Sequence, residues 1–300
     1  MKKILSNKKM LVILCMFALL LLAGCQRNVD GQGNVLPERI IYLDTPWSAM
    51  LNESILTAVL VYPLAQLINF IGGLTGSGVL GVVITTLLYN ALTIALSIKS
   101  TVSSQKMQMI QPELNKIQAK YEGRNDDNSR MQMYQEQQAL MQKYGVNPMA
   151  SLGTAFLQFP IMIAMFYAAQ RADVVVNGTF LGVPLQKTPW DGFTNIKEYW
   201  PLVLIFVIMV IMQFASSMLP KYLADKKRKS QKGYKAYADD GSANNAQMNT
   251  MMYTMIIMVV LLGIRWPTAM SVYWGVSSFA NILKTLFIQR RYIDNAEVRS

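Results

Sequence analysis

The stretch Gly78–Ile98, GVLGVVITTLLYNALTIALSI, decides the fold class. It contains no charged side chain. At about 1.5 Å of rise per residue it is long enough, as a helix, to cross the roughly 30 Å hydrocarbon layer of a membrane. A basic region that begins with Lys99 follows it directly. The stretch therefore predicts a transmembrane helix that ends at a cytoplasmic surface.

Four more apolar stretches follow: Ala150–Gln170, Trp200–Leu219, Met248–Ile264 and Pro267–Phe287. Residues 99–149 hold seven Lys/Arg against five acids and residues 220–247 seven against three, whereas residues 170–199 are balanced at three and three. Basic loops stay in the cytoplasm. The prediction is an all-α integral membrane protein with five transmembrane helices and a cytoplasmic C-terminus, at residues 288–300.

Composition narrows the chemistry. Apolar residues make up 52 % of the chain and charged residues 15 %, and there is no histidine. Metal sites and acid–base catalysis that use imidazole are therefore excluded. The sequence predicts no catalytic residue, no metal site, no cofactor and no small-molecule substrate. The net charge of +11 is concentrated in the predicted cytoplasmic loops, which indicates membrane topology rather than nucleic-acid binding.

The N-terminus reads as an export signal. Four lysines in the first nine residues precede an apolar run, which ends in Leu22-Ala23-Gly24-Cys25. This order resembles a bacterial lipoprotein signal, in which residues 1–24 are removed and Cys25 is lipidated at the outer face of the plasma membrane. The alternative is an uncleaved anchor helix, which explains the apolar run but not its ending.

Residues 25–77 are predicted to lie outside. Within them Glu53–Ile71 is apolar enough to be taken for another span, but counting it would place the basic residues 99–149 outside. Its apolar residues recur at helical spacing, with Gln66 and Asn69 off that stripe. This pattern predicts a helix in the interface plane, followed by turns at Gly72-Gly73 and at Gly76–Gly78.

Residues 99–149 are predicted to form a cytoplasmic helical hairpin. Its helices run from about Val102 to Tyr121, with a kink at Pro112, and from about Arg130 to Tyr144. Five methionines lie along them: Met107, Met109, Met131, Met133 and Met141. Methionine suits surfaces that meet varied apolar partners, and packing of the hairpin on itself explains them equally well.

The second basic loop, residues 220–247, carries Lys226-Lys227-Arg228-Lys229. It reads as a topology determinant or a contact for anionic lipid, with ribosomal RNA as the less favoured alternative.

Polar residues recur at helical spacing inside the predicted spans: Thr86, Asn90, Thr93 and Ser97; Ser151, Thr154 and Gln158; Gln213, Ser216 and Ser217; Trp274, Ser277, Ser278 and Asn281. Converging stripes would form a wetted groove. The alternative is that these side chains hold the helices together by hydrogen bonds. No ionisable residue lies deep in a span, which argues against an ion-driven transporter.

Several ordered motifs carry a family resemblance. The hairpin begins with IKSTVSSQKM at Ile98–Met107 and QPEL at Gln111–Leu114, and YGVNP at Tyr144–Pro148 leads to LQFPI at Leu157–Ile161. WPTAMSVYW at Trp266–Trp274 opens the last span. Over roughly residues 40–292 the chain resembles the YidC/Oxa/Alb membrane protein insertases, in the lipoprotein form found in Gram-positive bacteria.

The resemblance implies a hydrophilic groove, open to the cytoplasm and to lipid, through which nascent membrane proteins are inserted and folded. Candidate partners are the Sec translocon and the ribosome, beside the lipid bilayer. The groove residues would be Thr86, Asn90, Thr93, Gln158, Gln213, Trp274 and Ser277. Met107, Met109, Met131 and Met133 would receive the substrate.

One position departs from the family. An arginine usually lies in the groove where this chain has Asn90, so we expect insertase activity with an altered substrate range. The alternative function is that of a specialised scaffold or assembly factor for one partner complex, without general insertion.

Overall fold

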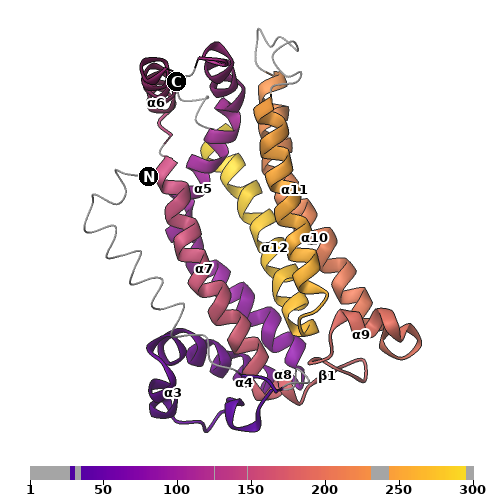
Figure 1. Cartoon of the computed structure of the whole chain (residues 1–300). Helices are drawn as coiled ribbons and strands as arrows, with labels where there is room; N and C mark the ends of the chain where they lie inside the picture. The colour runs from indigo at the N-terminus through magenta and orange to yellow at the C-terminus, as the bar shows by residue number, and fades with distance from the viewer. Residues whose placement is uncertain (1–27, 31–34, 125, 147, 231–242, 295–300) are drawn as a thin grey trace. The chain divides into compact units, whose positions relative to one another are not determined.

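The structure is a computed structural model that describes residues 28–30, 35–124, 126–146, 148–230 and 243–294. These residues are mostly α-helical, and their only strands form one short antiparallel pair, Thr179–Phe180 (β1) with Val183–Pro184 (β2) (Figure 1). The predicted helical class is confirmed. The predicted signal and Cys25 lie outside the described residues.

The five predicted apolar stretches fall in five helices, to within one residue at the ends of the last two. These helices are Gly78–Lys120 (α5), Pro148–Arg171 (α7), Ile196–Ser230 (α10), Ala243–Gly263 (α11) and Thr268–Ile288 (α12). Among the described residues, Thr57–Thr75 and Ile196–Lys227 are long and apolar enough to cross a membrane. A third candidate is α5, taken as two helices with a bend between them.

The chain forms two compact units. One contains the described residues of Met1–Thr85, Pro160–Leu202 and Pro267–Met270, and the other contains those of Thr86–Phe159, Val203–Trp266 and Ser271–Ser300. We call them the first and the second unit and describe each by itself. Because α5, α7, α10 and α12 are long, each contributes residues to both.

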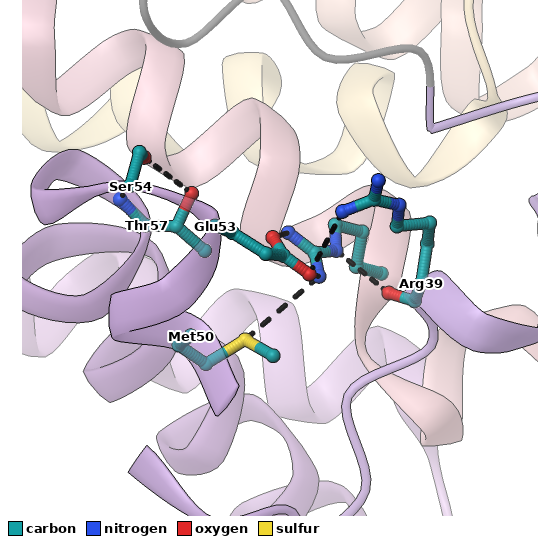
Figure 2. Close-up of polar contacts among 6 residues, drawn as sticks. Arg39, Met50, Glu53, Ser54 and Thr57 are labelled. Carbon is teal, nitrogen blue, oxygen red and sulfur yellow. Dashed lines mark hydrogen bonds and ion pairs between the residues drawn. The ribbon is translucent and has the colours of Figure 1, made fainter. Parts of the chain in front are cut away.

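The first unit is built from short helices around the end of α7. In chain order they are Pro37–Arg39 (η1), Trp47–Glu53 (α3), the π-helical turn Thr57–Val61 (η2), Tyr62–Thr75 (α4), Asp173–Val176 (α8) and Pro189–Thr194 (α9). The Ser54 hydroxyl accepts a hydrogen bond from the Thr57 backbone N–H (3.0 Å) and lies 2.9 Å from the Thr57 hydroxyl (Figure 2). Ser54 thereby satisfies a free donor where the helical segment begins.

One predicted turn is wrong. Gly72 and Gly73 lie inside α4, which ends at Gly76 in the left-handed conformation (φ 65°). A Cβ added to Gly72 would lie 2.6 Å from Cγ2 of Val174. The glycine at position 72 therefore serves the close approach of α4 to α8 rather than a turn.

The buried face of α4 contains both apolar residues and one amide. Ile68 and Ile71, which belong to the predicted apolar stripe, are buried there with Ala65, Asn69 and Gly72, whereas Phe70 and Leu74 are exposed. Asn69 donates to the carbonyl of Ile41 (2.6 Å) and accepts from the N–H of Val174 (3.2 Å). This amide was expected to lie off the apolar stripe, and the structure buries it.

A buried ion pair holds the segment before α4 to the end of α7. Arg171 is 2 % exposed and binds both carboxylate oxygens of Glu53, at 2.8 and 2.9 Å. Its Nε donates to the carbonyl of Arg39 (2.6 Å), and the Arg39 guanidinium lies 3.0 Å from Glu53. Figure 2 shows the side chains of Arg39, Met50 and Glu53 gathered around these contacts. We call Arg39, Glu53, Asn69 and Arg171 the Arg171 cluster.

The second unit contains the hairpin and a helical bundle. The hairpin is formed by the C-terminal half of α5 and by Asp127–Lys143 (α6). In the bundle α12 runs beside α10 (Figure 1), in agreement with their hydrogen bonds. At the end of α11, a Cβ on Gly263 would lie 3.1 Å from Met209 of α10. A π-helical turn, Gln289–Asp294 (η4), follows α12.

The bend in α5 lies before the predicted kink. The axes of Gly78–Ile94 and Ser97–Lys120 differ by 78°, whereas Pro112 lies farther on inside the helix. Hydroxyls at the bend bind carbonyls of their own helix: Thr93 binds Tyr89 (3.0 Å), and Ser97 binds Ile94 (3.1 Å). Such side-chain bonds compete with the backbone ladder and bend helices.

Candidate functional site

Two of the predicted polar stripes meet in the second unit. The hydroxyl of Ser278 on α12 donates to Oε1 of Gln213 on α10 (2.7 Å), and Nδ2 of Asn281 donates to Oγ of Ser216 (3.1 Å). These two bonds join α10 to α12 at positions three residues apart on each helix. They favour the adhesive interpretation of these two stripes over the groove interpretation.

The stripe on α5 behaves differently. Nδ2 of Asn90 donates to the carbonyl of Thr86, four residues earlier in the same helix, at 2.8 Å. Thr93 also binds its own helix, and both side chains are half-buried. The position at which the resemblance implies an arginine thus carries a neutral amide whose Nδ2 is bonded inside its own helix.

Trp274 is 9 % exposed. Its ring lies beside that of Trp266, with centroids 5.1 Å apart and planes inclined by 38°. Ser277, one of the other predicted groove residues, is half-buried, and the side chain of Gln158 lies outside the described ones. The tryptophan is therefore buried, with one ring stacked beside another aromatic side chain.

The hairpin has a small core of its own. Ile110, Leu114 and Val146 are buried together, and Met107, Leu140 and Met141 pack against them. Of the methionines predicted to receive substrate, Met107 belongs to this packing, Met109 and Met133 are half-buried, and Met131 is 62 % exposed. The packing of Met107 agrees with a hairpin that packs on itself, and the exposure of Met131 agrees with a surface that meets partners.

Polar bonds at both ends fix the pairing of the hairpin helices. Near the turn, Glu136 accepts hydrogen bonds from Lys120 (2.5 Å) and from the Tyr121 hydroxyl (2.8 Å), and these bonds lower the pKa of its carboxyl. At the other end the Tyr144 hydroxyl donates to Glu113 (2.8 Å), which raises the pKa of the tyrosine.

The turn itself was predicted from glycine and Asp/Asn residues. Gly123 adopts φ 82°, and Asp126 caps α6 by accepting from the N–H of Ser129 (2.9 Å). This backbone bond is the main reason that the pKa of Asp126 is lowered.

A polar cavity of about 200 Å³ lies in the second unit between α5, α10 and α12. It is lined by Ser100, Thr101, Ser104, Gln105 and Gln108 of α5, by Pro220 of α10, and by Asn281, Lys284 and Thr285 of α12. We call it the Lys284 cavity. None of its lining residues is acidic.

Sequence reasoning did not select Lys284, Gln105 or Gln108. Lys284 lies inside the predicted span Pro267–Phe287, and the two glutamines lie in the first helix of the predicted hairpin. The residues that meet at the cavity are far apart in the chain: Nε2 of Gln105 donates to the carbonyl of Thr285 (3.3 Å), 180 residues away. Only the spacing of Ser104, Gln105 and Gln108, on neighbouring turns of one helix face, was available as a signal.

Comparisons with known proteins all point to one protein family. The model of the 60Kd inner membrane protein family matches residues 70–295. Membrane protein insertase YidC 1 of Streptococcus pyogenes serotype M3 is 33 % identical over 233 residues, which cover 78 % of this chain and 74 % of that protein. Membrane protein insertase MisCA of Bacillus subtilis (strain 168) is 30 % identical over 230 residues, covering 76 % and 77 %.

A third relative extends the match slightly. Membrane protein insertase YidC of Oceanobacillus iheyensis is 29 % identical over 240 residues, or 80 % of this chain and 85 % of that protein. The matched region contains both the hairpin and the helices that line the Lys284 cavity. The chain therefore belongs to the 60Kd inner membrane protein family, together with the insertases named YidC and MisCA.

Proposed function

We propose that this protein is a membrane protein insertase, which inserts and folds nascent membrane proteins. The observation that carries the proposal is its match to YidC 1 of Streptococcus pyogenes over 233 residues, at 33 % identity. The relatives are named for insertion, and the match covers about three quarters of both chains. The protein would act by binding and positioning, without covalent catalysis.

The physical role is to lower the cost of moving a polar segment into a membrane. Unsatisfied peptide groups and charges are expensive in hydrocarbon. Polar side chains at membrane depth offer substitute hydrogen bonds while the apolar helix of the substrate moves into lipid. The half-buried Asn90 and Thr93 on α5, with Gln158 on α7, are proposed to line this path.

The interhelical hydrogen bond of Gln213 limits its role in contacting the substrate. Because its amide oxygen is bound to Ser278, a substrate would have to displace that bond to use it. Gln213, Ser277 and Trp274 are therefore proposed to shape the path, and Asn90 to contact the substrate. Met131, the most exposed of the hairpin methionines proposed to receive the substrate, is the best placed to do so.

The topology belongs to the same proposal. Five spans, in α5, α7, α10, α11 and α12, would place the hairpin, the second basic loop and the C-terminus in the cytoplasm. The segment Thr57–Thr75, which also passes the length and hydropathy criteria of a span, would lie along the outer interface. Support comes from the charge balance of the loops and from the exposed apolar residues Phe70 and Leu74 of α4.

The lipid anchor is proposed from Leu22-Ala23-Gly24-Cys25. Mass spectrometry of the mature chain is expected to find a diacylglyceryl group on Cys25, and a Cys25→Ser variant is expected to lack it. An intact N-terminus that still carries residues 1–24 would support the uncleaved anchor instead.

Complementation tests the function. The resident insertase of a bacterial host is depleted while this chain, its Asn90→Arg variant or an empty vector is expressed, with membrane levels checked by immunoblot. Rescue by the native chain is the expected result. Rescue by the arginine variant alone would indicate a relative with narrowed substrates. Failure of both at normal membrane levels would contradict general insertion and favour the scaffold, which co-purification with one partner complex would then identify.

A second experiment tests substrate range by comparing the native chain with Asn90→Arg and Asn90→Ala. If the neutral Asn90 restricts acidic substrates, Asn90→Arg should increase insertion of a substrate with an acidic N-terminal tail, and Asn90→Ala should not. Equal insertion by all three chains would show that the residue at position 90 does not set the preference.

A further inference from the structure

An open groove of about 470 Å³ lies in the second unit at the end of α12, and it combines an apolar wall with two arginines. Leu283, Leu286 and Phe287 form the wall, and Arg290 and Arg291 follow them in the chain. Leu283 and Phe287 are 51 % and 53 % exposed, and both arginines are exposed as well. None of the lining residues is acidic. We call this site the Arg290 groove.

The π-helical turn η4 holds the two arginines in place. Two of its other side chains, Gln289 and Ile293, are only 8 % and 4 % exposed. Nζ of Lys227 on α10 donates to the carbonyl of Ile293 (2.7 Å), and Nε2 of Gln289 donates to Oδ1 of Asp294 (2.8 Å). Because one face of the turn is buried and bonded in this way, the arginines are presented on its remaining, exposed face.

Neither arginine has a counter-charge among the described residues. No described side chain forms an ion pair or a hydrogen bond with either guanidinium. The nearest acid in the chain, Asp294, is bound to Gln289 and lies 3.9 Å from Nζ of Lys227. A guanidinium presents its N–H donors in a planar fork that matches a phosphate group. The groove therefore offers an anion site at the edge of an apolar surface.

We propose that the Arg290 groove binds an anionic phospholipid, whose phosphate lies between Arg290 and Arg291 and whose acyl chain lies along the apolar wall. The site would lie at the membrane surface, because the arginines follow directly after the proposed span Pro267–Phe287. Basic pockets at such a surface bind the head groups of anionic lipids. The inference goes beyond the proposed function and requires only that α12 spans the membrane, so it can fail while the insertase function stands.

Other ligands match only part of the groove. A free phosphate or the backbone of an RNA would pair with the arginines but would leave the apolar wall exposed. An apolar substrate helix would cover the wall and leave the arginines unpaired. A zwitterionic lipid would cover the wall, but its ammonium weakens the attraction of its phosphate to two guanidinium groups. An anionic phospholipid supplies both an acyl chain and a phosphate without a compensating cation.

The test uses the full-length protein in nanodiscs of phosphatidylcholine and phosphatidylglycerol, without any substrate. A trace of one lipid or the other carries a photoreactive acyl chain, and mass spectrometry locates the crosslinks. At residues 283–287 we expect the phosphatidylglycerol probe to crosslink about fivefold more or better, the value of one arginine at a membrane surface. Ile208 and Ile211, exposed apolar residues of α10, are the internal control and should show no preference. The same lipid preference at both places would overturn the proposal.

Variants separate a phosphate site from simple attraction of charge. Arg290→Gln with Arg291→Gln should bring the two probes to within about twofold of each other. Arg290→Lys with Arg291→Lys keeps the charge but loses the forked hydrogen bonds, and should leave about half of the preference or less. Arg124→Gln with Arg130→Gln, a matched change of two exposed arginines at the hairpin turn, should change nothing. A lysine variant equal to the native chain would show that no specific phosphate site exists.

Competition identifies the source of the phosphate. Inorganic phosphate or a fragment of ribosomal RNA, added at constant ionic strength, should leave the crosslinking at residues 283–287 unchanged. If either abolished it and left residues 208 and 211 unaffected, the arginines would bind a soluble phosphate or a nucleic acid, and the lipid proposal would be wrong. Because no substrate is present, none of these results depends on insertion, which rescue of the depleted host tests separately.

Discussion

The Arg171 cluster and the Lys284 cavity show two ways in which a largely apolar protein treats buried polar groups. In the first, Arg171 is bound to both oxygens of Glu53 and to the carbonyl of Arg39. In the second, Lys284 has no described partner and two amide oxygens accept nothing. Paired groups hold segments together, whereas groups left open cost stability unless a ligand fills them.

Two amide side chains, Asn69 and Gln108, illustrate the difference between paired and unpaired buried groups. Asn69 and Gln108 carry the same functional group, but Asn69 uses both ends of its amide, on Ile41 and Val174, whereas the oxygen of Gln108 has no partner in the described structure. The comparison teaches that burial of a polar side chain does not reveal its role. The role follows from whether the partners of that side chain are already present.

The largest effect is expected from breaking the Arg171–Glu53 pair. Glu53→Gln would leave the buried guanidinium of Arg171 without its counter-charge, and we expect the free energy of unfolding to fall by about 3–5 kcal/mol. Thermal unfolding of the detergent-solubilised protein measures it. Asp44→Asn, an exposed acid of the same segment, is the control and should change little. If the two variants lowered the free energy of unfolding equally, the buried Arg171–Glu53 pair would contribute no more than an exposed acid.

A smaller loss is expected from Asn69→Leu. This change leaves the N–H of Val174 without the Asn69 acceptor, at a cost of about 1–3 kcal/mol, whereas the carbonyl of Ile41 still accepts from the N–H of Asp173 (3.1 Å). Gln66→Leu, which removes a bond to the exposed Tyr42 carbonyl, should cost less than half as much, since water can replace that bond. The ordering would be contradicted if the Gln66 variant were the less stable one.

The next smaller loss of stability is expected from a change at the close contact between α4 and α8. Gly72→Ala places a Cβ 2.6 Å from Val174 and should lower the free energy of unfolding by about 1–2 kcal/mol. Gly73→Ala meets nothing within 4 Å, so it should be neutral or stabilising through helix propensity. Val174→Ala in the Gly72→Ala background should restore part of the loss. No rescue would mean that another contact is responsible.

The smallest effect concerns an exposed pair in the hairpin. Hydrogen bonds from Lys120 and then Tyr121 lower the pKa of Glu136. The carboxylate therefore stabilises the hairpin above the ordinary glutamate pKa, and this contribution is lost as the pH falls through the lowered value. We expect faster hydrogen exchange in α6 at acidic pH for the native chain, and no such change for Glu136→Gln. An equal pH response in both would assign the change to another carboxyl.

The sequence predicted the features that depend on local pattern. Apolar runs located the five long helices, Gly123 marked the hairpin turn, and the motif ending in Trp274 pointed to the family that the comparisons confirm. These features depend on hydropathy and backbone preference within about 20 residues, which one sequence displays directly.

The remaining features depend on pairing between distant segments. Asn69 was predicted to lie off the apolar stripe of its helix, and periodicity cannot show that Ile41 and Val174 would supply its partners. Gly72 was assigned to a turn because a glycine looks the same whether it serves a turn or a close contact. Glu53 was named only as the start of the stretch Glu53–Ile71, since its partner Arg171 lies 118 residues away. The Lys284 cavity was missed for the same reason.

The most direct test of the account compares the stability of Asn69→Leu with that of Gln108→Leu in matched preparations. Thermal unfolding of the detergent-solubilised protein measures it. We predict that Asn69→Leu lowers the unfolding temperature, whereas Gln108→Leu, which removes a buried oxygen without a described partner, leaves it equal or higher. The account would be contradicted if Gln108→Leu destabilised the protein as much as Asn69→Leu.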